Sequence, residues 1–200
     1  MKIVLATRNP GKIAELRRIL SEFADLQVVG LDAFPAIADV AETGVTFEAN
    51  ALLKAHAVAQ QSGLPAVADD SGLCVDVLGG MPGVFSARWS GRHGDDQANL
   101  ELLLRQVSDV PADLLTARFT CAAALALPSG ESRVVEGVLP GRLVTTPRGS
   151  NGFGYDPIFV PEGETRTTAE FAPEEKDAIS HRGRAFRAMA PIVRDLLAPS

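Results

Sequence analysis

The sequence lacks the segments that mark membrane and secreted proteins. No apolar run in its 200 residues approaches the length of about 18 residues that indicates a membrane-spanning helix. The apolar stretch after Lys2 is interrupted at Thr7, which makes it too short for the core of a signal peptide. We therefore expect a soluble, cytoplasmic protein with no membrane partner.

Basic residues and cysteines are also few. The 19 Lys and Arg residues are outnumbered by 25 Asp and Glu residues, which gives a formal net charge of −6. This balance disfavours a nucleic-acid polymer as a partner, because a long footprint needs a basic stripe, but it leaves room for a small anion in a local basic pocket. Cys74 and Cys121 lie in apolar strand-like runs, so we expect buried free thiols, with a disulfide as the alternative. No pair of histidines has the spacing of zinc ligands.

The chain contains no internal repeat, low-complexity segment or clear linker, and its apolar content is enough for a sizeable core. We expect a single domain over residues 1–200, or two small lobes around a cleft. Helices are predicted over 10–23, with an apolar stripe reaching Phe23, and over 46–62, 95–107 and 178–197, the last interrupted or kinked near Pro191. Strands are predicted at 2–7, 25–31, 66–68, 73–78, 116–127 and 132–145, the last broken at Pro140-Gly141. Strands and helices alternate at first and antiparallel-looking strands follow, which predicts a mixed α/β sheet.

The first strand-to-helix turn, TRNPGK at residues 7–12, is suited to phosphate. Asn9 is a good N-cap and Pro10 fits the first helical position, so the turn presents the free N–H groups and partial positive charge of a helix N-terminus. Thr7 adds a hydroxyl and Lys12 adds a cation. The alternative is an ordinary capped helix with a solvated lysine, because neither G-x-x-x-x-G-K-[ST] nor G-x-G-x-x-G is present.

Two adjacent carboxylates, Asp69 and Asp70, stand where the strand at 66–68 is expected to end. Paired carboxylates repel, and each raises the pKa of the other. A divalent cation removes that conflict, since Mg²⁺ binds one or two carboxylates together with waters and substrate phosphates. Alternation along a strand would point the two side chains to opposite sides, so we expect one to be catalytic and the other structural. The alternative is an acidic loop start with an Asx turn.

The predicted helix over 46–62 adds a second polar group. Asn50 and Lys54 are four residues apart, which places them on one face of the helix. Glu42 and Glu48 lie on either side of the helix start, and the helix dipole alone explains an acid such as Glu48 there. Taken by itself, Lys54 is most simply interpreted as a solvated lysine.

The segment GFGYD, residues 152–156, places two aromatic residues between or beside glycines. Glycine lets a backbone approach a ligand closely, and an exposed aromatic ring such as that of Phe153 gives a stacking face for a base. The alternative is a hairpin turn whose aromatic side chains belong to the core.

The segment SHRGR, residues 180–184, is unusual in its electrostatics. If Ser180 is an N-cap, the basic residues behind it occupy the first turn of a helix, which is the unfavourable end for cations. An anion or an acceptor-rich ligand would explain that placement. The alternative is that Arg182 and Arg184 pair with the nearby acids. These acids are Glu174, Glu175 and Asp177.

Together these motifs resemble the inosine triphosphate pyrophosphatase family, a family of house-cleaning hydrolases of nucleotide metabolism. The resemblance covers essentially the whole chain. The stretches that carry it are Thr7-x-Asn9-x-x-Lys12, ETGVTFEANALLKA from Glu42, ADDSGL from Ala68, GGMPGVFSARW from Gly79, GFGYDPIF from Gly152 and SHRGRA from Ser180. The resemblance implies an α/β fold with an elongated mixed β-sheet, flanking helices and two lobes around a central active-site cleft. It also implies a homodimer and Mg²⁺-dependent hydrolysis of XTP, ITP and dITP to the monophosphate and pyrophosphate.

The resemblance also implies roles for individual residues. Asp70 would be the catalytic general base, and Asp70 and Glu42 would bind the metal. The implied substrate-binding residues are Thr7, Arg8, Asn9, Pro10, Gly11, Lys12, Lys54, Ser71, Phe153, Gly154, Tyr155, Asp156, Lys176, His181 and Arg182. Of these, Thr7, Asn9, Lys12 and Lys54 would hold the triphosphate. Phe153 would stack on the base, and Lys176, His181 and Arg182 would recognise it.

Base selectivity has a physical explanation in this scheme. Inosine and xanthosine carry O6, an acceptor, where adenosine carries an amino donor, so a donor such as His181 or Arg182 would favour them. Guanosine also carries O6, so this contact alone does not explain its rejection. Two other functions stay open on the sequence alone. One is a pyrophosphatase acting on pyrimidine or modified nucleotides, as in the Maf-like proteins, and the other is a nucleotide-sensing module without catalysis.

Overall fold

The computed structural model describes residues 2–21 and 27–197. Its helices are α1 (Pro10–Ser21), α2 (Phe47–Ser62), α3 (Asp96–Gln106), α4 (Pro173–Ile179) and α5 (His181–Leu197). Its strands are β1 (Lys2–Leu5), β2 (Gln27–Gly30), β3 (Ala66–Val75), β4 (Met81–Pro82), β5 (Thr116–Ala126), β6 (Ser132–Leu143) and β7 (Phe159–Pro161). No helix in these described ranges is long and apolar enough to cross a membrane.

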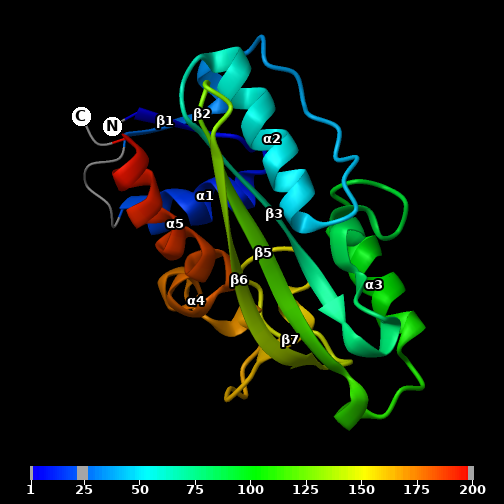
Figure 1. Cartoon of the computed structure of the whole chain (residues 1–200). Helices are drawn as coiled ribbons and strands as arrows, with labels where there is room; N and C mark the ends of the chain where they lie inside the picture. Colours follow the sequence, from blue (N-terminus) through cyan, green and yellow to red (C-terminus); the bar gives the residue numbers. More distant parts are fainter. Residues whose placement is uncertain (1, 22–26, 198–200) are drawn as a thin grey trace. The chain divides into compact units, whose positions relative to one another are not determined.

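The strands form one sheet in the order β2-β1-β3-β5-β6-β7, with β4 paired to β3 (Figure 1). Strand β1 runs parallel to β2 and to β3. Strands β4 and β7 run antiparallel to β3 and β6. The sheet is therefore mixed, and the predicted mixed α/β fold with flanking helices is confirmed.

The chain forms two compact units. Unit 1 comprises Met1–Asp70, Cys121–Gly137 and His181–Ser200, and unit 2 comprises Ser71–Thr120 and Val138–Ser180. Strands β3, β5 and β6 each contribute residues to both units. The two predicted catalytic-centre acids, Asp69 and Asp70, both belong to unit 1.

Unit 1 has an apolar layer on each face of its strands, with α1 and α5 on one face and α2 on the other (Figure 1). Strand alternation sorts β5 between them: Cys121, Ala123 and Leu125 pack toward α1 and α5, whereas the three alanines between and after them pack toward α2. The facing residues of α2 are small as well, so the helix can lie close to the strands. Cys74 and Cys121 are both buried free thiols, as predicted.

Unit 2 has a separate core built from β3, α3, β5, β6 and β7. The rings of Phe119 and Phe159 meet in it with centroids 4.6 Å apart and a tilt of 59°, a favourable aromatic geometry. Tyr155 also belongs to this core, and its hydroxyl donates to the carbonyl oxygen of Ser86 at 2.9 Å.

The predicted helix ends are confirmed by their caps. Asn9 Oδ1 accepts from the N–H of Lys12 at 3.1 Å, and Thr46 Oγ1 accepts from the N–H of Ala49 at 3.1 Å. Helix α2 ends at Gly63, which has φ of 68°, a conformation that favours glycine. The predicted stripe residue Phe23 and the first two residues of the predicted strand 25–31 lie outside the described residues.

Three predicted breaks differ from the structure. The prediction that the strand ends before Asp69 is wrong, because β3 continues to Val75 and keeps both carboxylates within a strand. The break expected at Pro140-Gly141 is also wrong: β6 is continuous, and the exposed Pro140 is tolerated because β7 pairs with β6 only from Gly141 onward. The single helix expected over 178–197 is divided at Ser180, whose ψ of 152° is extended, and not at Pro191, which lies inside α5.

Candidate active site

Asp69 and Asp70 point to opposite faces of β3, because successive side chains of a strand alternate. Asp69 contacts Lys12 of α1 and Arg182 of α5, whereas Asp70 contacts Asn50 and Lys54 of α2. Both acids are buried. The strand can continue through them because each face supplies partners for one carboxylate.

The Asp69 side is a network of paired charges. Lys12 Nζ lies 2.9 Å and Arg182 Nε 3.2 Å from Asp69 Oδ2, and Arg182 Nη1 also pairs with Glu15 of α1. Burial opposes ionisation of Asp69, but the charges of Lys12 and Arg182 outweigh it and hold its pKa well below the usual range. Two carboxylates face two cations, so this network is neutral.

The Asp70 side carries an excess of negative charge. Lys54 Nζ lies 3.2 Å from Asp70 Oδ1 and 2.8 Å from Glu42 Oε1, so one ammonium serves two carboxylates. Burial, assisted by Glu42, raises the pKa of Asp70 despite the opposing charge of Lys54. Burial acts to lower the pKa of Lys54, but the nearby carboxylates of Asp70, Asp69 and Glu42 outweigh it, so that pKa is raised.

The donor set on the Asp70 side fits a Mg²⁺ ion. Asp70 Oδ1 and Glu42 Oε1 converge on the same cationic atom, Lys54 Nζ, so both oxygens can approach one positive centre. The described ranges hold no group of three or more His, Cys, Asp or Glu side chains suited to a metal, so a cage made of protein ligands alone is not present there. Mg²⁺ does not need one, because it binds one or two carboxylates and completes its shell with water and phosphate oxygens.

The turn before α1 has the features expected of an anion site. Thr7 Oγ1 accepts from the N–H of Asn9 at 3.2 Å, and no acidic residue lies in the first turn of α1. The exposed Arg8 pairs with the segment at residues 37–39. Its Nε lies 2.9 Å from Asp39 Oδ1, and its Nη2 donates to the carbonyl oxygen of Ile37. Pro10 and Gly11 begin the helix, so their backbone lies at its positive end.

The aromatic turn of unit 2 is held by its own acid. Asp156 Oδ2 accepts from the N–H of Phe153 at 2.9 Å and pairs with the Nζ of the buried Lys176. This pair places Lys176 Nζ 5.2 Å from the centroid of the half-buried Phe153 ring. The N–H of Gly154 donates to Asp96 Oδ2 at 2.9 Å. The turn is therefore fixed through Asp156 and Asp96, while Tyr155 is buried in the core.

The start of α5 is brought onto β6 by a glycine. A Cβ at Gly137 would collide with the backbone of His181 and of Ala185, so only glycine allows this close approach. His181 and Arg182 are consequently buried. The half-buried Ser71 follows Asp70 directly in β3.

Several partners in these networks were not predicted from the sequence. Arg182 pairs with Glu15 and Asp69, two acids that the interpretation from the sequence did not name. Glu15 carries a detectable signal, because a charged residue beside Leu16 and four positions before Ile19 stands on the buried stripe of α1. The contact of Asp96 with Gly154 joins segments 58 residues apart and has no local signal.

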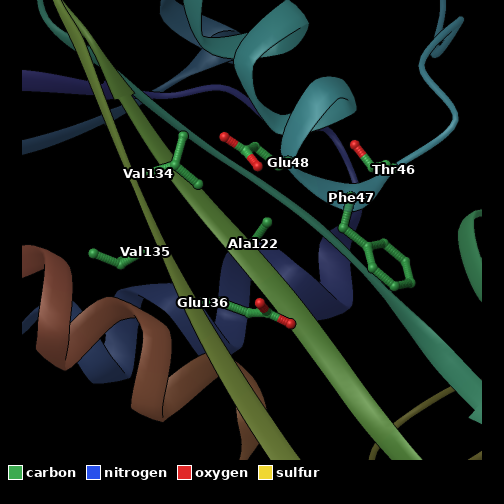
Figure 2. A pocket seen from close by; sticks show the side chains of 7 residues that line it. All are labelled: Thr46, Phe47, Glu48, Ala122, Val134, Val135 and Glu136. Carbon is green, nitrogen blue, oxygen red and sulfur yellow. The ribbon is translucent and has the colours of Figure 1, made fainter.

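A hollow of about 320 Å³ lies beside the N-terminus of α2 in unit 1 (Figure 2). It is lined by Thr46, Phe47, Glu48, Ala122, Val134, Val135 and Glu136. Its ionisable side chains are the exposed acids Glu48 and Glu136, which would repel a phosphate. The hollow is therefore unsuited to a triphosphate, and its lining includes none of the predicted site residues.

Comparison with known proteins identifies the family. The model of the Ham1 family matches residues 3–192. The chain belongs to the Ham1 family. A dITP/XTP pyrophosphatase from Streptomyces avermitilis is 68% identical over 198 residues, with 98% of each chain covered. One from Mycobacteroides abscessus is 56% identical over 199 residues, with 98% of this chain and 97% of the relative covered.

Solved structures of Ham1 proteins have the same fold. The Ham1 protein of Staphylococcus aureus is 38% identical with a TM-score of 0.86, and 98% of this chain and 99% of that chain are covered. The nucleoside-triphosphatase / dITP/XTP pyrophosphatase of Mycobacterium abscessus is 56% identical with a TM-score of 0.77, and 96% and 100% are covered. The six motif stretches all lie within the part of the chain that matches the Ham1 family, which confirms the resemblance drawn from them.

Proposed function

We propose that this chain is a nucleoside-triphosphate pyrophosphatase that hydrolyses XTP, ITP and dITP to the nucleoside monophosphate and pyrophosphate. The observation that carries the proposal is the Asp70–Lys54–Glu42 arrangement, in which two buried or half-buried carboxylates share one ammonium. Such a centre attracts a further cation, and a metal-bound triphosphate brings one. The names of relatives such as the Streptomyces avermitilis dITP/XTP pyrophosphatase support dITP and XTP as substrates.

In this proposal the triphosphate binds at the positive end of α1. The turn at residues 7–12 offers helix N–H groups, the Thr7 hydroxyl and the Lys12 ammonium, and Lys54 supplies a second cation. Asp70 and Glu42 would hold Mg²⁺, which when bound neutralises phosphate charge and lowers the pKa of water.

Asp70 is proposed to act as the general base. Its carboxylate lies beside the proposed metal position and can accept a proton from a water bound there. A water oxygen forms the new bond to the α phosphorus, the phosphoanhydride bond between the α and β phosphates breaks, and the proton passes to Asp70. Pyrophosphate is the leaving group, and because water attacks directly the reaction needs no covalent intermediate.

Base recognition is proposed for the aromatic turn and for the start of α5. Phe153 would stack on the base beside Lys176, with Gly154, Tyr155 and Asp156 shaping the turn. His181 and Arg182 would donate to O6. Arg182 uses Nε for Asp69 and Nη1 for Glu15, and a guanidinium has five N–H donors, so it can hold both acids and still donate to a base.

The reaction is tested by measuring pyrophosphate released from XTP, ITP, dITP, ATP, GTP, dTTP and UTP, with and without Mg²⁺. Metal-dependent release from the first three alone is the expected result. Preferential release from dTTP and UTP would favour the pyrimidine-directed alternative, and tight ITP binding without release would favour a sensing module. Orthophosphate in place of pyrophosphate would mean that a different bond is cleaved.

We also propose a homodimer that acts in the cytoplasm to remove non-canonical purine nucleotides. The loop GGMPGVFSARW is a candidate for subunit contact, because its Phe85 is exposed. Sedimentation of the wild-type chain and of Phe85→Asp tests the dimer and the candidate interface. A monomeric wild-type chain would contradict the dimer, and a dimeric variant would contradict this interface.

A further inference from the structure

We propose that Asn50 is a positioning residue that sets the orientation of Asp70 and its separation from Glu42. The proposal rests on the proposed function, because it assigns Asn50 a role in that same centre. Asn50 is completely buried near the start of α2. Its backbone N–H donates to the carbonyl oxygen of Thr46, so the helix fixes where its side chain begins.

The two ends of the Asn50 amide have different and unambiguous partners. Asn50 Oδ1 accepts from the backbone N–H of Gly44 at 2.8 Å, and Asn50 Nδ2 donates to Asp70 Oδ2 at 3.1 Å. A backbone N–H can only donate, so the amide oxygen must face Gly44. The amide nitrogen must then face Asp70, which therefore presents Oδ2 as an acceptor.

This assignment divides the work of the Asp70 carboxylate between its oxygens. Oδ2 is occupied by Asn50, whereas Oδ1 faces Lys54 at 3.2 Å and shares that cation with Glu42. A carboxylate held at one oxygen cannot rotate freely about its terminal bond. Asn50 thus directs Oδ1 toward the point where the proposed metal and water would bind.

The same amide also anchors the segment that carries Glu42. Gly44 is two residues beyond Glu42, and its N–H bond to Asn50 fixes the backbone there. A Cβ at Gly44 would lie 2.7 Å from Asn50 Oδ1 and 2.8 Å from the Cβ of Ala49, so the contact requires glycine. A single buried amide therefore couples the position of Glu42 to that of Asp70.

Three variants test the two halves of this link. Asn50→Ala removes both hydrogen bonds, Asn50→Asp keeps the acceptor for Gly44 but loses the donor to Asp70, and Gly44→Ala disturbs the link from the other side. For each, kcat and KM for ITP are measured as functions of Mg²⁺ concentration. Mn²⁺ affinity is measured without nucleotide, and hydrogen exchange of the Gly44 amide is followed by NMR.

We expect kcat to fall about 10–100-fold in Asn50→Ala and Asn50→Asp, the range typical of partners that orient metal ligands. KM for ITP at saturating Mg²⁺ should stay within about threefold of wild type, because the side-chain hydrogen bonds of Asn50 go to Gly44 and Asp70 and not to the turn at residues 7–12. Mn²⁺ affinity should fall about 10-fold or more in Asn50→Ala and Gly44→Ala. Gly44 exchange should accelerate in Asn50→Ala and stay slow in Asn50→Asp.

Asn99→Ala is the matched control. Asn99 is likewise a buried asparagine near the start of a helix, α3, and its Oδ1 accepts from the backbone N–H of Ser90 at 2.7 Å. It belongs to unit 2, whereas both candidate metal ligands belong to unit 1, so its loss should lower stability while kcat, KM and Mn²⁺ affinity stay within about twofold of wild type.

Wild-type kcat in Asn50→Asp, or wild-type Mn²⁺ affinity in Asn50→Ala and Gly44→Ala, would overturn the proposal. If Asn50→Ala does not fold, the other two variants decide it. If the wild-type chain releases no pyrophosphate from ITP, the proposed function fails, whereas the Mn²⁺ affinities and the Gly44 exchange rates still decide the role of Asn50.

Discussion

Arg182 and Asp69 are 113 residues apart in the chain, yet Arg182 Nε donates to Asp69 Oδ2 at 3.2 Å in the interior of unit 1. The same guanidinium binds Glu15, so three buried charges depend on one another. Removing one member of a buried pair leaves the others uncompensated, and this cost exceeds what the intact pair contributes.

Arg182→Met is therefore expected to lower the free energy of unfolding by about 3–5 kcal/mol in urea denaturation. Arg118→Met is the control, because Arg118 lies 2.9 Å from Asp76 in an exposed pair and should cost at most about 1 kcal/mol. Equal losses in the two variants would contradict the view that Arg182 owes its importance to burial.

The same substitution, Asp to Asn, should lower stability by different amounts at the two neighbouring acids of β3. Asp69→Asn unbalances the neutral network with Lys12 and Arg182 and should destabilise the chain by about 3 kcal/mol. Asp70→Asn removes the excess negative charge beside Glu42 but turns its amide NH2 toward a donor, Asn50 Nδ2 or Lys54 Nζ, so the loss of stability should be smaller, about 1–2 kcal/mol. Turnover of ITP should nevertheless fall about 10²–10⁴-fold in Asp70→Asn, the usual contribution of a general base. An active Asp70→Asn variant would exclude that role.

The buried Cys121 thiol gives stability a dependence on alkaline pH. Burial raises the pKa of Cys121 well above its ordinary value of 9.0, so the folded chain keeps a proton that the unfolded chain releases. The stabilisation is complete below pH 9 and is lost as pH rises above it, at about 1.4 kcal/mol per pH unit. Urea denaturation between pH 7 and 11 should show a steeper decline for the wild-type chain than for Cys121→Ala. Parallel curves would contradict this assignment.

Local signals predicted the elements of this fold well. The caps Asn9 and Thr46 satisfy helix N–H groups within their own turns, and the alternation that separates Asp69 from Asp70 is a property of any strand. Both features depend on residues within a few positions of one another, so the sequence alone contains them.

Partners that are distant in the chain were harder to predict. Glu15 and Arg182 are 167 residues apart, and their pairing depends on how α1 packs against α5. The continuity of β3 depends on the packing of helices on both of its faces. The strand can pass through two acids only because α1 and α5 supply partners for Asp69 and α2 supplies partners for Asp70. Asn50 was recognised as lying on the face of Lys54, but its bond to Gly44 depends on a loop whose path no periodicity describes.

Lys54 and a metal ion should compete for the same pair of carboxylates. In Lys54→Met, Asp70 and Glu42 lose their shared ammonium, so the variant should be less stable than wild type without Mg²⁺. A Mg²⁺ concentration of about tenfold the Kd of Lys54→Met should then raise the Tm of that variant by about 3–6 °C. The same concentration should raise the Tm of the wild-type chain by less, because Lys54 weakens Mg²⁺ binding there. Adding Asp70→Asn to Lys54→Met should abolish the Mg²⁺ effect, because only one carboxylate remains. The same Tm shift in the single and the double variant would place the metal elsewhere, since stabilisation would then not depend on Asp70.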